Sequence, residues 1–334
     1  MKTAVIGAGS WGTALAIVLA DAGHEVGIWA RETDIVSSIN KKQVNPTYLK
    51  SVALPSQITA YTSLAECCRG AKLVIMATPS HAMRTVATKT ADSLDSDAVV
   101  VSVAKGIELD GFNRMSNVLK EALDGVIPAG QIGVLSGPTH AEEVALRKPA
   151  AIVASSQERQ TSVFIQNSLI TPMLRVYINS DITGVEIAGS VKNIMAIATG
   201  IIDGAELGDN AAAGLITRSL AEIKRFGINL GAKEETFNGL AGIGDLVVTC
   251  TSRHSRNRYV GYEIGRGKKL SDVIEKMDMV AEGVKTTKSV REWGQSLGID
   301  MPITESVYQV LFEDVKPQQA VYDLMTREPK EEAC

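Results

Sequence analysis

Three glycines near the amino terminus have the spacing of a phosphate-binding turn. Gly7, Gly9 and Gly12 directly follow the first apolar run and open a helical stretch. In a strand, turn and helix of this kind, the first glycine permits a tight turn, the second admits a pyrophosphate and the third allows close packing. The amides of Ser10, Trp11 and Gly12 would face the phosphates at the positive end of the helix. A glycine-rich turn without a ligand is the alternative, and the context favours a dinucleotide site.

The end of the second expected strand bears on which dinucleotide is bound. The stretch "EVGIWARETD" (25–34) places Arg31 where a protein selective for NAD would carry an acid that contacts the ribose. A guanidinium suits the additional phosphate of NADP. The sequence therefore favours NADPH over NADH, although Glu32 and Asp34 leave use of both cofactors open. An exposed charge after a strand is the alternative role for Arg31.

A lysine in an apolar helical stretch is the candidate acid and base. Lys192 has Ala188, Met195 and Ala196 as neighbours one turn away. Burial there would lower the pKa of its ammonium toward neutrality, where a group gives and takes protons efficiently. Alcohol and ketone chemistry at a nicotinamide needs such a group beside the oxygen. The alternative is a lysine whose charged end reaches the surface. Asn193 is either a ligand contact or a packing residue.

A cluster of basic and polar residues is suited to bind a phosphate. The stretch "TSRHSRNRYV" (251–260) combines Arg253, Arg256 and Arg258 with Ser255 and Asn257. Guanidinium, hydroxyl and amide groups ahead of a helix are the donors that a phosphate needs. A solvated basic loop is the alternative. An RNA-binding patch fits less well, because the cluster is short and the whole chain is acidic.

Composition bounds the class of protein. The chain has 334 residues, a formal charge of −4 and a pI near 5.7, which predicts two domains and no nucleic-acid partner. No apolar run approaches membrane-spanning length, so no membrane span is expected. A strand begins at once, so no export signal is expected. The cysteines and histidines lack ligand spacing, which predicts no metal and a reducing cytoplasm. The cysteines are Cys67, Cys68, Cys250 and Cys334.

The sequence pattern changes part-way along the chain, which indicates two domains. Short β-branched runs alternate with helical stretches in the first part, and their continuous apolarity suits parallel strands covered on both faces. Helical stretches punctuated by glycine or proline follow from about residue 185. We therefore expect an α/β domain with a doubly wound sheet over 1–184 and an all-α domain over 185–334. The expected strands are 2–7, 25–30, 72–77, 98–103, 132–136, 150–155 and 174–178.

Several long motifs, in order, resemble the bacterial NAD(P)-dependent glycerol-3-phosphate dehydrogenases. The resemblance implies reversible reduction of dihydroxyacetone phosphate to sn-glycerol 3-phosphate, which feeds glycerophospholipid synthesis. It also implies a Rossmann-like domain followed by a helical domain similar to the carboxyl-terminal domain of 6-phosphogluconate dehydrogenase, commonly as a homodimer. The motifs are "VSVAKGIE" (101–108), "LSGPTHAEEV" (135–144), "EIAGSVKNIMAIATGI" (186–201) and "GLAGIGDLVVTCTSRHSRNRYVG" (239–261).

The resemblance also assigns site residues. It makes Lys192 the catalytic acid and base. It implies substrate contacts at Lys105, Gly137, Thr139, Lys192, Asn193, Asp245, Thr249, Ser255, Arg256 and Asn257. It implies cofactor contacts at Gly7, Gly9, Ser10, Trp11, Gly12, Arg31, Lys105, Ala141, Arg256, Val280 and Glu282.

Some of these residues have simpler alternatives. Asp245 could cap a helix, and Glu282 could be an ordinary acid in a first helical turn. The chain reads Gly-Pro-Thr-His at 137–140 where the family commonly reads Gly-Pro-Ser-Phe. Thr139 keeps the hydroxyl, and we expect His140 to be a wall residue rather than a catalytic one.

Two other functions fit parts of this pattern. One is a dehydrogenase for a different hydroxy acid, and the other is a dinucleotide-binding sensor without catalysis. The arginine cluster suits a phosphate better than a lone carboxylate, which argues against the first. The combination of lysine, aspartate and arginine argues against the second. Fold alone would not separate the three.

Overall fold

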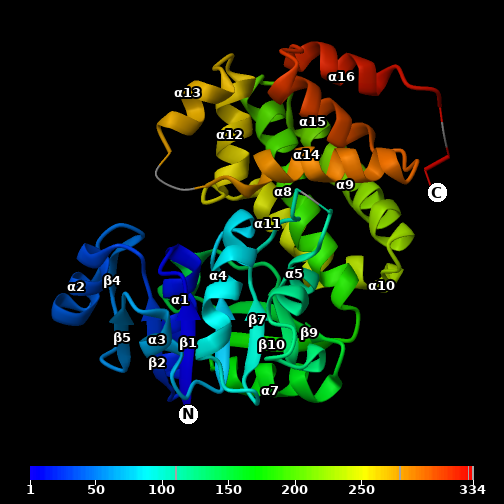
Figure 1. The fold of residues 1–334 in the computed structure, drawn as a ribbon. Coiled ribbons are helices and arrows are strands. Elements are labelled where there is room, and N and C mark those ends of the chain that lie inside the picture. Colours follow the sequence, from blue (N-terminus) through cyan, green and yellow to red (C-terminus); the bar gives the residue numbers. More distant parts are fainter. Residues whose placement is uncertain (110, 278–279, 330, 333–334) are drawn as a thin grey trace.

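Strands and helices alternate through the first half of the chain and build a twisted sheet. The computed structural model describes residues 1–109, 111–277, 280–329 and 331–332. Within them the sheet has eight strands in the order β10-β9-β8-β7-β6-β1-β2-β5. A helical domain stands over the edge of the sheet at which β1 ends (Figure 1). The strands are β1 (Lys2–Ile6), β2 (Glu25–Trp29), β5 (Ile58–Tyr61), β6 (Leu73–Met76), β7 (Val99–Ser102), β8 (Ile132–Ser136), β9 (Ala150–Ser156) and β10 (Leu174–Asn179).

Helices cover both faces of the sheet, which confirms the doubly wound, Rossmann-like prediction. Alternate residues of β1 enter different cores: Val5 packs on one face, and Ala4 and Ile6 on the other. The first face is covered by α1 (Ser10–Asp21), α2 (Thr33–Lys42), α6 (Ala141–Ala145) and α7 (Arg159–Leu169). The second is covered by α3 (Leu64–Cys68), α4 (Met83–Thr90) and α5 (Met115–Ala122). Short 3-10 turns lie at Ser80–Ala82, Ala91–Ser93 and Ala129–Gln131.

Strand direction departs from the expectation at one edge. β8 and β9 pair antiparallel, with Leu135 opposite Ala154, and β10 then runs parallel to β9. The expectation of parallel strands is therefore wrong for β9 and β10 relative to the rest of the sheet. The connection from β8 to β9 holds only the short α6 and does not cross the sheet, so the chain returns in the opposite direction.

The sequence did not predict three of the strands. β5 forms the edge beside β2, and Ile58 and Ala60 are buried while Thr59 between them is exposed. A separate antiparallel pair consists of β3 (Val44–Asn45) and β4 (Leu49–Ala53). These strands are short and half exposed, so they lack the continuous apolar run that revealed the central strands.

The second half of the chain is helical around its own apolar core. Its central helix, α8, is long and apolar enough to cross a membrane by length and composition, which the sequence reading did not anticipate. Its most apolar stretch is entirely buried inside the protein, which explains that composition. The helices are α8 (Ile182–Gly204), α9 (Asp209–Asn229), α10 (Glu234–Phe237), α11 (Asp245–Thr251), α12 (Arg256–Gly265), α13 (Leu270–Glu275), α14 (Glu282–Ser296), α15 (Pro302–Phe312) and α16 (Pro317–Met325), with a π-turn at Leu240–Gly244.

Glycines let α8 and α12 pack backbone to backbone. A Cβ on Gly200 would overlap the carbonyl oxygen of Arg258, and one on Gly261 would overlap that of Ile197. Gly204 and Gly265 repeat the arrangement one turn further along. The close approach fixes where α12 begins relative to α8, and both helices carry predicted site residues.

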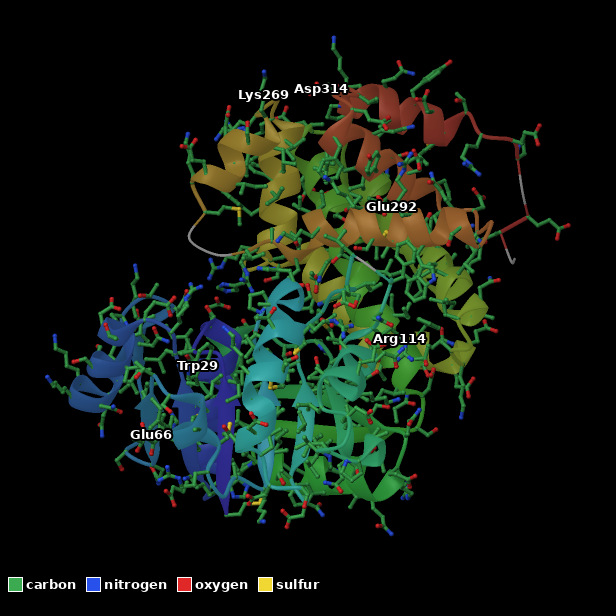
Figure 2. All side chains as sticks on the ribbon, viewed as in Figure 1. Trp29, Glu66, Arg114, Lys269, Glu292 and Asp314 are labelled. Carbon is green, nitrogen blue, oxygen red and sulfur yellow. The ribbon has the colours of Figure 1, made fainter. Side chains whose placement is uncertain are left out.

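A buried carboxylate joins the two domains. Glu186 on α8 accepts hydrogen bonds from Ser116 N at 2.7 Å, from Ser116 Oγ at 2.6 Å and from Arg114. Arg114 lies where the sheet domain meets the helices (Figure 2). The sheet ends at Asn179 and α8 begins at Ile182, so the expected boundary between residues 184 and 185 falls within the first turn of α8. That boundary stays a prediction.

Substitution of Gly261 by alanine should lower the free energy of unfolding by about 1–3 kcal/mol, because the added methyl group forces the two helices apart. Gly214 on α9 is the matched control, since a Cβ there meets no described atom within 4 Å. Gly214→Ala should raise the free energy of unfolding by about 0.5–1 kcal/mol. Denaturant unfolding measures both changes. Equal effects of the two substitutions would contradict the close packing.

Candidate active site

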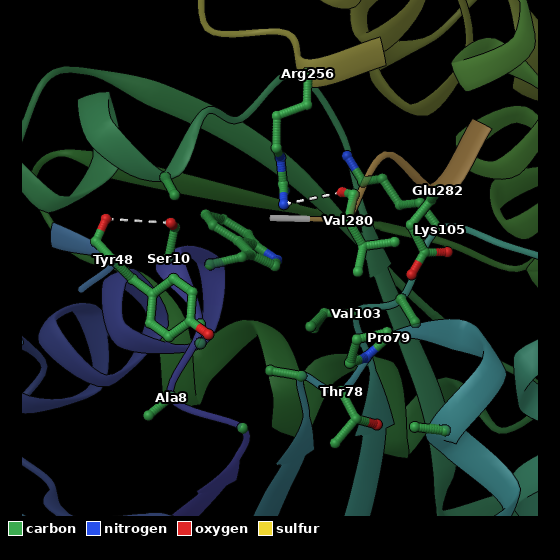
Figure 3. A pocket seen from close by; sticks show the side chains of 18 of the residues that line it. Ala8, Ser10, Tyr48, Thr78, Pro79, Val103, Lys105, Arg256, Val280 and Glu282 are labelled. Carbon is green, nitrogen blue, oxygen red and sulfur yellow. Dashed lines mark hydrogen bonds between the residues drawn. The ribbon is translucent and has the colours of Figure 1, made fainter. Parts of the chain in front are cut away.

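A cavity of about 950 Å³ lies between the sheet domain and the helical domain. Its floor is formed by the turns that follow β1, β2, β6, β7 and β8, at the edge where open parallel sheets bind ligands. Its roof comes from α8, α11, α12 and the start of α14. Figure 3 shows Arg256 reaching in from the helical domain, while Ser10 and Tyr48 lie on the glycine-loop side.

The glycine loop fits a dinucleotide phosphate. Gly7 has φ of +120°, and a Cβ there would lie 2.7 Å from the carbonyl oxygen of Ala77. A Cβ on Gly12 would overlap the carbonyl oxygen of Gly7, whereas one on Gly9 would meet no described atom within 4 Å. The first and third glycines are therefore required by packing, and the second faces open space. The amides at the start of α1 are placed to receive an anion.

Asn45 supports this loop, and the sequence reading missed it. Its side chain is fully buried and donates to Ala8 O at 2.8 Å and to Thr13 Oγ1 at 2.9 Å. Its Oδ1 accepts from the amide of Tyr48 at 3.2 Å, and Ser10 Oγ donates to Tyr48 O at 3.2 Å. The signal was present as an Asn-Pro pair in "VNPTY", which is typical of a side-chain-stabilised turn.

Arg31 lies at the end of β2 on the cavity wall. Its guanidinium donates to Glu32 Oε1 from Nε at 3.2 Å and from Nη2 at 2.9 Å. The Arg31 side chain is 83% exposed, so this pair is weak and leaves the guanidinium available. Of the three residues that bear on cofactor choice, Arg31 and Glu32 therefore lie together on the wall, and Asp34 does not line the cavity.

Lys192 is buried on α8 and reaches the cavity. Its ammonium donates to Asp245 Oδ1 and to Thr249 Oγ1, the latter at 2.5 Å. Asp245 begins α11 without capping it through its side chain, and Thr249 lies one turn later on the same face. The helix-cap alternative for Asp245 therefore does not describe its side chain.

Asp245 is shared by two lysines. Its Oδ2 accepts from Lys105 Nζ at 2.8 Å, while Oδ1 accepts from Lys192. Burial raises the pKa of Asp245, but Lys105 and Lys192 outweigh it and hold that pKa below its usual value. Burial lowers the pKa of Lys192 to about 7, against the attraction of Asp245 and with the help of repulsion from Lys105. A lysine in this state can change protonation near neutral pH.

Residues after β7 and β8 surround this cluster. Lys105 also donates to Gly137 O at 3.1 Å, and Asn193 Nδ2 donates to Lys105 O at 3.0 Å. Thr139 and Ala141 line the cavity beside them. Gly137 and Asp245 do not line it themselves, but they hold lysines that do.

The three arginines of the predicted cluster lie in different places in the structure. Ser255, Arg256 and Asn257 line the cavity at the start of α12. Arg256 Nη1 donates to Val280 O at 3.2 Å (Figure 3). Arg258 instead pairs with Asp203 at the far end of α8, and Arg253 is exposed away from the cavity wall.

The remaining predicted residues also lie on the wall. Val280 and Glu282 precede and begin α14, and both line the cavity. Glu282 is in a first helical turn, as its alternative role requires, yet its carboxylate binds Ser80 rather than lying free. His140 lines the cavity, where burial lowers its pKa, and its ring lies 5.8 Å from that of His254.

Comparison with protein families covers most of the chain. A model described as the NAD-dependent glycerol-3-phosphate dehydrogenase N-terminus matches residues 2–162. A model described as the C-terminus of the same enzyme matches residues 181–322.

Individual proteins agree with the family models. The chain is 51% identical over 332 residues to a glycerol-3-phosphate dehydrogenase (NAD(P)+) of Chlorobium phaeobacteroides, with 99% of each chain covered. It is 52% identical to the protein of the same name from Chlorobium limicola, with the same coverage. The crystal structure of a glycerol-3-phosphate dehydrogenase from Coxiella burnetii superimposes with a TM-score of 0.93 at 40% identity, covering 98% of this chain and 99% of that one.

Substitution of Asn45 by alanine should raise the Kd for NADPH by about 10-fold, because it removes two hydrogen bonds that fix the glycine loop. Asn40 provides a matched control, since it makes a similar pair of bonds with the backbone of Ala60, at 2.9 and 2.7 Å. Asn40→Ala should lose stability without loss of NADPH affinity. Binding titrations and unfolding curves separate the two effects. An unchanged Kd in Asn45→Ala would show that the loop keeps its shape without this side chain.

Proposed function

The chain belongs to the NAD-dependent glycerol-3-phosphate dehydrogenase family, and we propose that the cavity between its domains is where it performs that family's reaction. The reaction is the reversible reduction of dihydroxyacetone phosphate to sn-glycerol 3-phosphate, a step of phospholipid synthesis. The observation that carries the assignment is the cluster of Lys192, Asp245 and Lys105, whose two lysines line the same cavity as the glycine loop and Arg256.

Lys192 is the proton donor and acceptor in this proposal. When bound, the nicotinamide cofactor supplies or accepts the hydride at the substrate's middle carbon. In the direction of reduction, the Lys192 ammonium gives its proton to the former ketone oxygen. In oxidation the neutral amine removes that proton. Asp245 and Thr249 hold Nζ in place, and Lys105 adds positive charge beside the oxygen.

The start of α12 binds the substrate phosphate in this proposal. Arg256 supplies charge, and Asn257 and Ser255 supply neutral donors. Ser255 Oγ already accepts the amide of Arg258 at 3.2 Å as the helix cap, which leaves its hydroxyl proton available to an anion. Thr139 contacts the rest of the substrate from the floor of the cavity and Asn193 from its roof, and Gly137 positions Lys105.

The glycine loop and the end of β2 bind the cofactor. Gly7, Gly9 and Gly12 shape the turn, and Ser10 and Trp11 begin the helix that faces the pyrophosphate. NADP or NAD is the cofactor, as in relatives named for both. We infer a preference for NADPH, because the Arg31 guanidinium suits the additional phosphate while Glu32 beside it provides an acceptor for a ribose hydroxyl.

Further cofactor contacts are proposed on the wall near the nicotinamide end of the cavity. Lys105, Ala141, Arg256, Val280 and Glu282 line it there. They come from both domains, so the cofactor would be held between them.

We also infer a homodimer that works in the cytoplasm. The dimer rests on the resemblance to the family. The reducing compartment is supported by Cys67, Cys68 and Cys250, which are buried free thiols. Cys334 lies outside the described residues.

The function is tested by the loss of NADPH absorbance with dihydroxyacetone phosphate, with oxaloacetate and a 3-oxo acid as controls. We expect turnover only with the triose phosphate, and a higher kcat/KM with NADPH than with NADH. Turnover of the oxo acids would instead indicate a hydroxy-acid dehydrogenase. Cofactor binding without any turnover would indicate a dinucleotide sensor. Either result overturns the assignment.

The pH dependence tests the role of Lys192. Reduction needs the ammonium, so the rate of reduction should fall as pH rises through about 7, while the rate of oxidation should rise over the same range.

Two variants test the same role. Asp245→Asn removes an influence that raises the pKa of Lys192, so the midpoint of the pH profile should move to lower pH. Lys192→Ala should lose about 10²-fold or more in kcat without loss of NADPH affinity. A midpoint that stays in place in Asp245→Asn would contradict the assignment.

A further inference from the structure

The segment at the start of α14 touches both halves of the site. Residues 280–283, here called the strap, comprise the two residues before α14 and its first two residues, and Val280 and Glu282 line the cavity. Figure 3 shows Val280 of the strap between Arg256 and the sheet-domain residues Pro79 and Thr78, with Glu282 to the side, next to Lys105. The strap thus lies between the cofactor side and the substrate side.

On the cofactor side, the strap is tied to the turn after β6. The Glu282 carboxylate accepts from Ser80 N at 2.9 Å through Oε1 and from Ser80 Oγ at 2.6 Å through Oε2. Ser80 is buried and begins a 3-10 turn at the carboxyl edge of the sheet. Two charge-assisted hydrogen bonds between residues 202 positions apart form a specific contact between the domains.

On the substrate side, the strap holds the start of α12. Val280 O accepts from Arg256 Nη1 at 3.2 Å, and Gly283 N donates to Asn257 Oδ1 at 3.0 Å. The strap also presses on α8, because a Cβ on Gly283 would lie 2.7 Å from Asn193 O. Two of the three residues proposed to bind the substrate phosphate, Arg256 and Asn257, are therefore bonded to the strap.

We propose that Glu282 is a positioning residue that, through Ser80 and the strap, sets Arg256 and Asn257 at a fixed place relative to the cofactor domain. Without the two hydrogen bonds to Ser80, the strap is held less firmly to the sheet domain, and the positions of Arg256 and Asn257 relative to the sheet are less well fixed. We expect the larger cost to fall on substrate affinity, because Arg256 and Asn257 are both hydrogen-bonded to the strap. This inference rests on the proposed function of the cavity.

Steady-state kinetics of the full chain test the role of Glu282. Glu282→Ala should raise the KM for dihydroxyacetone phosphate by about 10-fold, with a smaller change in kcat and in the Kd for NADPH. Glu282→Gln should restore most of the affinity, since an amide oxygen still accepts from Ser80 N. Glu292→Ala, an exposed position on the same helix, is the matched control and should behave as wild type.

A double-mutant cycle tests the route through Ser80. Ser80→Ala should raise the KM for the triose phosphate by about 3-fold alone and add nothing in the Glu282→Ala background. The proposal would be overturned if Ser80→Ala raised the KM by the same factor in the Glu282→Ala background as in the wild type. An increase in the Kd for NADPH with an unchanged KM for the triose phosphate would also overturn it, since that pattern marks a direct cofactor contact only.

Hydrogen exchange separates this proposal from the proposed function. The Ser80 amide donates to Glu282, so it should exchange faster in Glu282→Ala than in the wild type or in Glu292→Ala. This readout does not depend on turnover. If the triose phosphate is not a substrate but exchange accelerates, the proposed function fails and the strap contact stands. If exchange at Ser80 is unchanged, the strap proposal fails whatever the substrate.

Discussion

One buried carboxylate between two lysines is the interaction on which the site depends. Asp245 accepts from Lys192 and Lys105, which come from different domains. Burying one charge alone is costly, but two ammonium groups around a carboxylate compensate that cost and leave the cluster near neutral when Lys192 gives up its proton. The same bonds bring α8, α11 and the turn after β7 together. The hydrogen bonds that orient the lysines for catalysis are therefore the same bonds that join the two domains.

Neighbouring residues restrict the motion of each member of this cluster. Thr249 completes the orientation of the Lys192 ammonium, and Asn193 holds the backbone of Lys105. Glu186 ties α8 to the start of α5, so the helix that carries Lys192 cannot shift along the sheet. A reacting group that must lie within hydrogen-bonding distance of a small substrate needs such support, because small displacements reduce rates strongly.

Much of this arrangement was predictable from residues, and some was not. Apolar neighbours at helical spacing predicted the burial of Lys192. The position of the three glycines between the first strand and the first helix predicted the dinucleotide-binding turn. The net pKa of Lys192 was not predictable, because it depends on a third charge, Lys105, that only the fold brings near. Asn45 was missed because the atoms to which it donates, Ala8 O and Thr13 Oγ1, belong to residues 37 and 32 positions away, which only the fold brings near. The reversal at β9 was missed because apolarity marks a buried strand without giving its direction.

The glycines between α8 and α12 have a consequence for substrate size. Lys192 lies on one of these helices, and Arg256 begins the other. With the backbones in contact at Gly200 and Gly261, main-chain packing fixes the spacing between the helix positions that carry Lys192 and Arg256. A ligand with a longer distance between its reacting oxygen and its phosphate has to be accommodated by these two side chains, because moving the helices apart would disrupt the core of the helical domain.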